Sequence, residues 1–267
     1  MKVKNKVIVV TGGGSGIGRQ LVLYLIRKGA VVAAVDVNVD ALNETKNLVS
    51  SPSANLSIHQ LDIANRESVS NLVAQVIGRH GCVDAIINNA GIIHPFHPVN
   101  ELDYDVIERM INVNFYGVIN ITKEFLPLLL LRPSAHIVNV SSVGGLFAFP
   151  NQTFYGASKA AVKLFSEGLY AELRNTNVGV TVVFPGAINT NITKNCGAHN
   201  ERIEKFNRIY KGTPAETAAR CIIAGIEKSR FRVTVGIDAK ILSFLYRLCP
   251  RLTIVLIGKV MKMAMPD

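Results

Sequence analysis

Near its start the chain reads Thr11-Gly-Gly-Gly-Ser-Gly-Ile-Gly18. An apolar run at 6–10 precedes these residues and predicts a buried strand, and an amphipathic stretch at 16–28 predicts the helix that they open. Glycines in such a turn let backbone amides approach a diphosphate at the positive end of the helix. This context indicates a dinucleotide-binding βαβ unit, and the alternative is a tight structural turn.

The rest of the chain continues the alternation of strand and helix. Apolar runs predict strands at 31–35, 56–61, 83–87, 135–140, 179–183 and 232–235. Helices are expected at 40–49, 67–78, 104–130 with a bend at Pro127, 153–174 and 214–228, the last with Thr213 as N-cap and Pro214 at the first helical position. Each crossover is long enough for a parallel connection. We therefore expect an α/β fold with a doubly wound parallel sheet of six or seven strands and helices on both faces.

Length and composition limit the alternatives. The chain has 267 residues, of which 49% are hydrophobic and 18% charged, so it can cover both faces of a parallel sheet. No linker interrupts the pattern, and we expect residues 1–240 to form one domain, followed by an apolar, basic tail at 241–267. The four cysteines are dispersed, without metal-ligand spacing. They predict reduced thiols, a cytoplasmic location and no metal site.

The formal net charge is +10. Basic residues are scattered through the first 190 positions without a Lys/Arg-rich block, so nucleic acid is not an expected partner. Much of the excess lies late in the chain, which indicates a basic C-terminal face and makes acidic lipid headgroups or an anionic substrate candidate partners.

Asp36 ends the second predicted strand. A carboxylate there can accept hydrogen bonds from the adenosine ribose and repels a 2′-phosphate, which favours NAD over NADP. The alternative is an Asp that caps the next helix. Arg19 and Lys28 are expected near Asp36, and their positive charges could weaken this preference for NAD over NADP.

Further motifs carry a resemblance. Asn88-Asn-Ala-Gly91 follows the fourth strand, and Tyr155 and Lys159 lie four residues apart on one face of a predicted helix. The glycine turn and these two motifs follow one another in the order that is typical of one family. On this basis the chain resembles the short-chain dehydrogenase/reductase family from residue 5 to about 238. The resemblance implies a Rossmann-like fold, and Asp62, Asn114, Ser142, Pro185, Gly186 and Thr190 also match.

An unperturbed phenol has a pKa of about 10 and needs a nearby cation to act as a base near neutral pH. Lys159 would supply that charge to Tyr155. The resemblance implies that Lys159 also binds the nicotinamide ribose, that Ser142 holds the substrate oxygen, and that Asn114 supports a water-linked proton relay. Ser141 competes with Ser142 for its role, and Asn114 could instead satisfy backbone groups inside its own helix.

The same resemblance implies a set of cofactor contacts along the chain. The expected cofactor-binding residues are Gly12, Ser15, Gly16, Ile17, Gly18, Asp36, Asp62, Ile63, Asn89, Ala90, Gly91, Tyr155, Lys159, Pro185, Gly186, Ile188 and Thr190.

The substrate side is specific to this chain. Family substrates are usually bounded by the segment at 191–212 and by the loop after Gly91. Phe147, Phe149 and Phe154 suggest an apolar pocket, although they could equally pack in the core. His94 and His97 lie among prolines and more often belong to a rigid surface loop than to a catalytic site.

The segment 241–263 is very apolar, with basic interruptions. Arg247, Pro250 and Arg251 break it into pieces shorter than the ~20 residues of a spanning helix, which excludes a transmembrane anchor. Three alternatives remain: an interfacial membrane helix, a cover for the active site, and a subunit interface in a homodimer or homotetramer.

Taken together, the sequence predicts an NAD-dependent oxidoreductase. It would transfer a hydride between the nicotinamide and the carbonyl or secondary alcohol of a hydrophobic small molecule of the lipid-like kind, with Tyr155 as acid/base. The alternatives are a nonenzymatic nucleotide-binding scaffold or sensor and, less favoured, an epimerase or dehydratase on the same fold.

Overall fold

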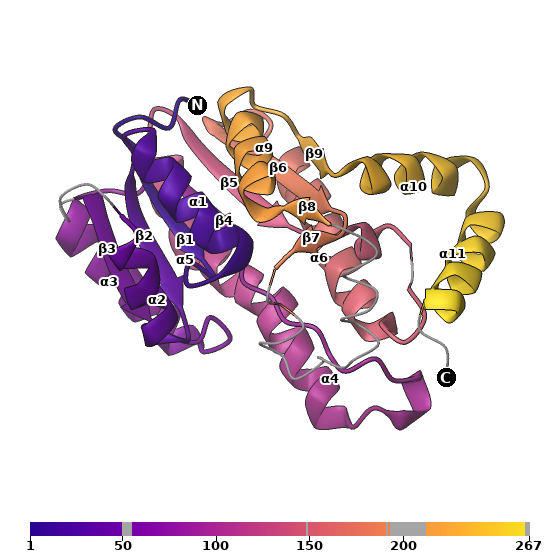
Figure 1. Ribbon diagram of the computed structural model, residues 1–267. Coiled ribbons are helices and arrows are strands. Elements are labelled where there is room, and N and C mark those ends of the chain that lie inside the picture. The colour runs from indigo at the N-terminus through magenta and orange to yellow at the C-terminus, as the bar shows by residue number, and fades with distance from the viewer. Residues whose placement is uncertain (50–54, 148, 191, 193–211, 265–267) are drawn as a thin grey trace.

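The computed structural model describes residues 1–49, 55–147, 149–190, 192 and 212–264. A parallel sheet of seven strands runs through the molecule in the order β3-β2-β1-β4-β5-β6-β9 (Figure 1). The strands are β1 (Val7–Thr11), β2 (Val31–Asp36), β3 (Leu56–Gln60), β4 (Ala85–Asn88), β5 (Ala135–Val140), β6 (Val178–Pro185) and β9 (Arg232–Val235). The expected doubly wound sheet is confirmed, with seven strands.

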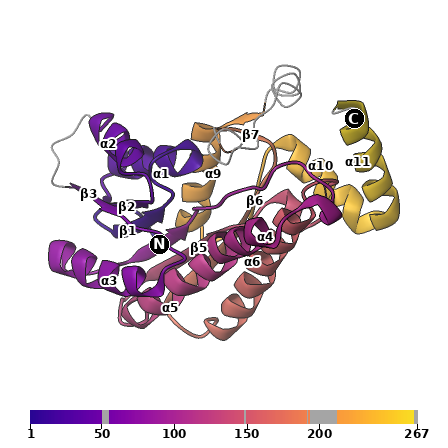
Figure 2. The ribbon, with the colours of Figure 1, turned by 90° about the horizontal axis from the view of Figure 1, so that it is seen from below.

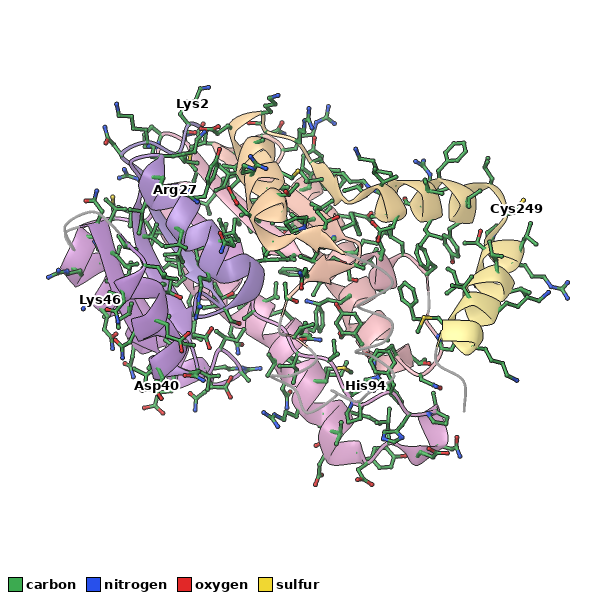
Figure 3. All side chains as sticks on the ribbon, viewed as in Figure 1. Lys2, Arg27, Asp40, Lys46, His94 and Cys249 are labelled. Carbon is green, nitrogen blue, oxygen red and sulfur yellow. The ribbon has the colours of Figure 1, made fainter. Side chains whose placement is uncertain are left out.

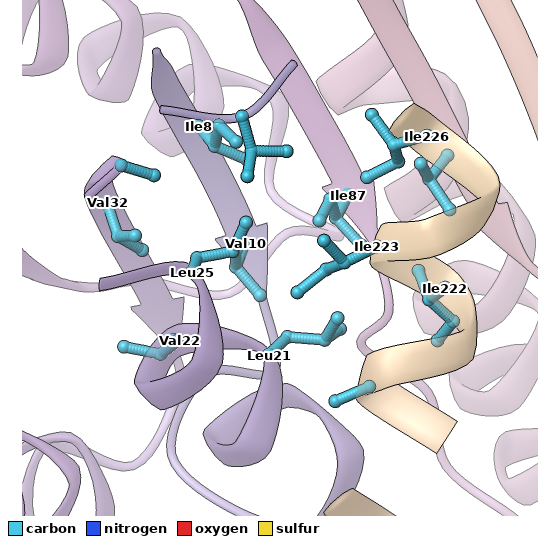
Figure 4. Close-up of a cluster of buried hydrophobic side chains, with 14 of the residues drawn as sticks. Ile8, Val10, Leu21, Val22, Leu25, Val32, Ile87, Ile222, Ile223 and Ile226 are labelled. Carbon is cyan, nitrogen blue, oxygen red and sulfur yellow. The ribbon is translucent and has the colours of Figure 1, made fainter. Parts of the chain in front are cut away.

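Helices cover both faces of the sheet (Figure 2). One face carries α1 (Gly16–Arg27), α2 (Val39–Asn47) and α9 (Ala215–Glu227). The other carries α3 (Arg66–His80), α5 (Gly117–Leu130) and α6 (Thr153–Glu172). Side chains alternate along a strand, so Val10 packs on the side of α1 and α9 (Figure 4). Val9 packs on the side of α3 and α5.

The strand order reverses between β1 and β4. From β1 the chain moves outward through β2 to β3, then returns to β4 and continues in the other direction. In open α/β sheets, ligands bind in the crevice outside the carboxyl ends of the strands at such a switch point. The glycine turn after β1 and the Asn88-Asn-Ala-Gly91 segment after β4 therefore meet at the edge where a ligand is expected.

The long helix expected at 104–130 is interrupted. It consists of α4 (Tyr104–Ile111), a π-helical segment (Asn112–Tyr116) and α5, which continues through Pro127 to Leu130. A π-helical turn carries an extra residue and often marks a functional position. The interruption places Asn114 in the irregular turn, a feature that apolar periodicity does not reveal.

The start of α9 also differs from the expectation. Helix α9 begins at Ala215, with Pro214 in the N-cap position. Thr213 and Pro214 form β8 (Thr213–Pro214), which pairs with β7 (Ile188–Asn189), and Thr213 N donates to Ala187 O at 2.8 Å. This pairing holds Thr213 in extended backbone, so the prediction of Thr213 as N-cap was wrong by one residue.

After β9 the chain forms two helices, α10 (Ile237–Leu248) and α11 (Pro250–Ala264), with Cys249 at the corner between them (Figure 3). Their inner faces pack on the segment that follows β5, where Val143, Phe147, Ala239 and Ile257 form a small buried cluster. Within the described ranges, every helix is too short or too polar to span a membrane.

Candidate active site

A cavity of about 990 Å³ opens at the carboxyl ends of the strands. Residues that directly follow β1, β2, β3, β4, β5 and β6 all contribute to its wall, and α4 borders it on one side. The cavity thus extends along the sheet from β3 to β6 and crosses the switch point between β1 and β4, a length that suits an extended ligand.

Most of the residues expected at the site line this cavity. They are Gly12, Ser15, Gly16, Ile17, Asp36, Asp62, Ile63, Asn89, Ala90, Gly91, Ser142, Tyr155, Lys159, Pro185, Gly186, Ile188 and Thr190. Two expected residues, Gly18 and Asn114, do not line it. The segment 191–212, apart from Ile192 and Gly212, lies outside the described residues.

The glycine turn requires its glycines for different reasons. Gly12 and Gly16 have φ of +69° and +51°, which L side chains rarely adopt. A Cβ on Gly18 would lie 1.8 Å from Gly12 O, so Gly18 lets α1 pack directly on the turn. Gly18 thus shapes the turn from behind and does not line the cavity, and its expected contact with a cofactor stays a prediction.

Thr11 connects the end of β1 with the residues that follow β4, on the two sides of the switch point. Its Oγ1 accepts hydrogen bonds from Asn89 N at 3.0 Å and from Ala90 N at 3.1 Å, and Asn89 Nδ2 donates to Thr11 O at 3.0 Å. The Asn89 side chain therefore fixes the end of β4 against the glycine turn through its Nδ2.

Asp36 is held by backbone amides at the far end of the cavity. Its Oδ2 accepts from Gly14 N at 2.9 Å and its Oδ1 from Asn38 N at 3.1 Å. The N-cap of α2 is Asn38, whose side chain accepts from Ala41 N. The alternative that Asp36 caps this helix is therefore wrong. A carboxylate has about four acceptor positions, so two remain for a ligand.

The cations that could weaken the effect of Asp36 are engaged elsewhere. Arg19 Nη2 lies 2.7 Å from Glu44 Oε2, and Arg19 Nε donates to Gly14 O at 2.9 Å. Lys28 forms an ion pair with Glu227 at 2.7 Å. Arg19 still lines the cavity, but with an acidic partner beside it.

Tyr155 and Ser142 meet across Gly144. Tyr155 lies in the first turn of α6, and Ser142 follows β5 and accepts from Gly144 N at 3.0 Å. A Cβ on Gly144 would lie 3.4 Å from both Ser142 Oγ and Tyr155 Cε1. The competing Ser141 is buried and donates its hydroxyl to Lys159 O at 2.7 Å, so the structure favours Ser142 as the serine whose side chain faces Tyr155.

Lys159 lies one turn further along α6 and is only 4% exposed. Its Nζ donates to Val140 O at 3.1 Å, and burial lowers the pKa of this amine to about 8. A Cβ on Gly91 would lie 3.0 Å from Lys159 Nζ and 3.1 Å from Asn114 Oδ1. Only a glycine at position 91 lets these two side chains approach the loop after β4.

Asn114 is fully buried and hydrogen-bonds outside its own helix. Its Oδ1 accepts from Ile92 N at 2.8 Å, and its Nδ2 donates to Ile92 O at 2.9 Å and to Ser158 Oγ at 3.0 Å. These contacts disagree with the alternative that Asn114 serves backbone groups within its helix. Instead, this one side chain connects the π-helical segment with the loop after Gly91 and with α6.

The aromatic and histidine residues of the substrate side lie mostly in packed positions. Phe147 contacts Phe149 and Tyr246 with ring centroids 5.4 and 5.7 Å apart, away from the cavity wall. His94 is buried, and its Nδ1 contacts Pro95 O at 2.6 Å, while its backbone carbonyl accepts from Gln152 Nε2 at 2.8 Å (Figure 3). Packing thus accounts for Phe147, whereas the buried His94 Nε2 has no hydrogen-bond partner among the described residues and His97 is exposed beside Glu101.

Sequence reasoning missed part of the cavity wall. Val37 and Leu61 follow β2 and β3, Asp105, Glu108 and Arg109 come from α4, and Asn112 begins the π-helical segment. Val37 could have been found from its place directly after Asp36. The α4 residues carry no motif, because only the packing of that helix brings them to the cavity.

The chain is similar to known proteins along most of its length. The family model described as short chain dehydrogenase matches residues 6–201. A relative named putative oxidoreductase SadH, from Mycobacterium tuberculosis, is 40% identical over 253 residues, which cover 92% of this chain and 91% of the relative.

Two solved structures are similar along nearly the whole chain. A short chain dehydrogenase/reductase from Burkholderia phymatum, in complex with NAD, has a TM-score of 0.85 at 26% identity and covers 94% of this chain and 96% of its own. A short chain dehydrogenase from Burkholderia cenocepacia, in complex with NADP, has a TM-score of 0.80 at 25% identity, with coverage of 96% and 99%.

Proposed function

Because this chain belongs to the short chain dehydrogenase family, we propose that it transfers a hydride between a nicotinamide cofactor and a carbonyl or secondary alcohol carbon. The observation that carries the proposal is the position of Tyr155, Ser142 and Lys159 on the wall of the cavity that the glycine turn also lines. A nonenzymatic nucleotide sensor would need the turn but not a phenol, a hydroxyl and an amine together.

The residues present fit a nicotinamide dinucleotide. The turn from Gly12 to Gly16 has backbone conformations that a Cβ would strain, at the positive end of α1, where a diphosphate would bind. Asp36 retains acceptor positions for ribose hydroxyls, and Ile188 and Thr190 would contact the nicotinamide half. When bound, the cofactor would supply the hydride donor or acceptor carbon.

Tyr155 would exchange the proton of the substrate hydroxyl. Its phenol needs a neighbouring positive charge to act near neutral pH, and Lys159, with a pKa of about 8, carries that charge at pH 7. Ser142 would hold the substrate oxygen. Asn114 would support a proton relay toward Lys159 from its position behind Gly91.

We further propose that NAD is preferred over NADP and that the substrate is a small apolar alcohol or ketone. The carboxylate of Asp36 would repel a 2′-phosphate, and Arg19, the cation beside it, is paired with Glu44. The similar solved structures include one with NAD and one with NADP, so the preference depends on this chain's own residues.

The test is Tyr155→Phe, with Tyr170→Phe as the matched control on the same helix. Tyr170 lies against Phe231, with ring centroids 4.4 Å apart. We expect kcat on a panel of alcohols and ketones to fall by about 10²- to 10⁴-fold in Tyr155→Phe, with NADH affinity within about threefold of the native value and Tyr170→Phe unaffected. Unchanged turnover in Tyr155→Phe would exclude its role as acid/base.

The proposal extends to partners. Helices α10 and α11 contribute no residue to the cavity wall among the described positions, which weighs against the expected cover for the active site. A homodimer or homotetramer through these helices, and contact with a membrane surface, are the two remaining expectations for the tail.

A further inference from the structure

Helices α10 and α11 carry an apolar outer surface. Ile237, Ile241, Phe244 and Leu248 recur at helical spacing along α10 and are 76%, 53%, 63% and 63% exposed, opposite the buried Ala239. On α11, Leu252 is 68% exposed, and the neighbouring Val255 and Leu256 are also exposed. Contiguous apolar surface of this kind on a monomer marks an interaction site.

The charges on the same two helices are almost all positive. The basic residues are Lys240, Arg247, Arg251, Lys259 and Lys262, and all are exposed. The acid between Ile237 and Lys262 is Asp238, whose Oδ2 accepts from Ala187 N at 2.8 Å. Asp238 therefore faces the body of the protein, and the outer surface carries cations without acids.

A hollow of about 250 Å³ lies where α10 meets the edge strand β9. It is lined by Arg232, Thr234, Lys240, Ser243, Phe244 and Arg247. Arg232 Nη2 donates to Ser243 Oγ at 2.9 Å, and its guanidinium lies 4.5 Å from the ring centroid of Phe184. Three cations and two hydroxyl residues, Thr234 and Ser243, thus surround one hollow at the molecular surface.

These cations lack acidic partners. Among the residues that the structure describes, Arg232, Lys240 and Arg247 form no ion pair within 4.0 Å. Burial and the neighbouring Arg247 lower the pKa of the Arg232 guanidinium, although Glu167 opposes this. The two guanidinium groups repel each other, so an anion with several oxygens in the hollow would relieve the repulsion.

We propose that α10 and α11 dock on a membrane surface that contains anionic phospholipids. The apolar face of α10 enters the boundary between headgroups and acyl chains, and a lipid phosphate occupies the hollow between Arg232, Lys240 and Arg247. Phe244 belongs to both the apolar face and the wall of the hollow. Acyl chains and a headgroup would therefore contact adjacent parts of one surface, as at an interfacial helix.

Charge favours a membrane over a second copy of the chain. A two-fold interface would bring the same basic patch against itself, with like charges facing each other. An anionic bilayer complements the five cations. Figures 1 and 2 show α10 and α11 at one edge of the molecule, at the opposite end of the sheet from α2 and α3, where a flat surface can reach them.

The test is flotation of the full chain with vesicles of phosphatidylcholine alone or of equal parts phosphatidylcholine and phosphatidylglycerol. We expect flotation with the anionic vesicles, weakened by salt. Lys240→Gln with Arg247→Gln should weaken partitioning about 25-fold, since each cation near an anionic surface adds about fivefold. Ile241→Ser with Phe244→Ser should reduce it by more than about tenfold.

Matched controls remove the same side-chain types elsewhere. Arg79→Gln with Lys123→Gln removes two exposed cations from α3 and α5, and Leu131→Ser with Leu164→Ser removes two exposed apolar side chains. Both controls should float as the native chain does. NADH titration of every variant reports whether the dinucleotide site is intact. Flotation does not require turnover, so failure of the proposed enzymatic function would leave the flotation result unchanged.

Three outcomes would overturn the proposal. The first is a native chain that does not float with anionic vesicles. The second is self-association, detected by light scattering, that the tail variants abolish while flotation is absent, which would assign the surface to a second copy. The third is saturable binding of inorganic phosphate that Lys240→Gln with Arg247→Gln abolishes, again without flotation, which would assign the hollow to a dissolved anion.

Discussion

At the scale of single residues, the carboxylate of Asp36 is the side chain on which cofactor choice depends. We expect Asp36→Asn to lower the ratio of the NADPH to the NADH dissociation constant by about tenfold, because it removes the charge that repels a 2′-phosphate and keeps one acceptor oxygen. Fluorescence titration of both cofactors measures the ratio. Asp40→Asn, an exposed carboxylate on α2, is the control. Equal affinity of the native chain for both cofactors would contradict the argument.

Burial of the Lys159 amine lowers the free energy of unfolding by an amount that depends on pH. Its folded-state pKa of about 8 lies below the ordinary 10.5. Between these values the unfolded chain binds more protons at this site, so the contribution of Lys159 to the free energy of unfolding rises with pH. Below pH 8, the buried ammonium destabilises the fold relative to a neutral side chain of similar size.

Denaturation of the native chain and of Lys159→Met measures this effect. The difference in unfolding free energy, native minus variant, should rise by about 3 kcal/mol between pH 8 and 10.5. Other titrating groups cancel in the difference. A difference that stays constant over this window would show that the amine does not titrate there.

Sequence reasoning named most residues of the cavity wall from its motifs, but not how their side chains are used. Gly18 and Asn114 belong to recognisable motifs, yet one shapes the turn from behind and the other fixes Ile92. Spacing identifies which residues come near each other along a helix or at a strand end. It does not specify which hydrogen bonds a buried amide makes, since these depend on elements distant in the chain.

At the scale of elements, strand and helix were predictable wherever apolar periodicity was strong. All seven strands of the main sheet were expected within a few residues of their ends, because buried parallel strands are continuous apolar runs. The π-helical segment was not, because one extra residue in a helix leaves the apolar pattern nearly unchanged. Its position becomes meaningful only with the hydrogen bonds of Asn114.

Asn114→Ala tests whether those bonds maintain the segment. The variant loses three hydrogen bonds and leaves the Ile92 amide and carbonyl unpaired. We expect the free energy of unfolding to fall by about 2–4 kcal/mol and amide exchange in Asn112–Tyr116 to accelerate. Asn47→Ala, at an exposed position, should change neither quantity. Unaltered exchange in the segment would mean that backbone packing alone holds the π-helical turn.

At the scale of the whole molecule, α10 and α11 are joined to the segment that follows β5 through a small cluster of buried side chains. The inner faces of α10 and α11 cover Val143 and Phe147, which follow the serine proposed to hold the substrate oxygen. The expected division at residue 240 falls inside α10, which begins at Ile237. Composition indicated an apolar, basic segment here but could not separate its packed face from its exposed one.

Ile257 tests whether α11 packs on the body as firmly as the sheet helices do. Its side chain is 4% exposed within the cluster, whereas Leu252 on the same helix is 68% exposed. We expect Ile257→Ala to lower the free energy of unfolding by about 2–4 kcal/mol through the lost burial and the cavity left behind, and Leu252→Ala to change it by less than about 0.5 kcal/mol. Chemical denaturation measures both. If both substitutions lowered the free energy of unfolding by the same small amount, α11 would be loosely attached to the body of the protein. The outer surface proposed to contact lipid would then have no fixed orientation.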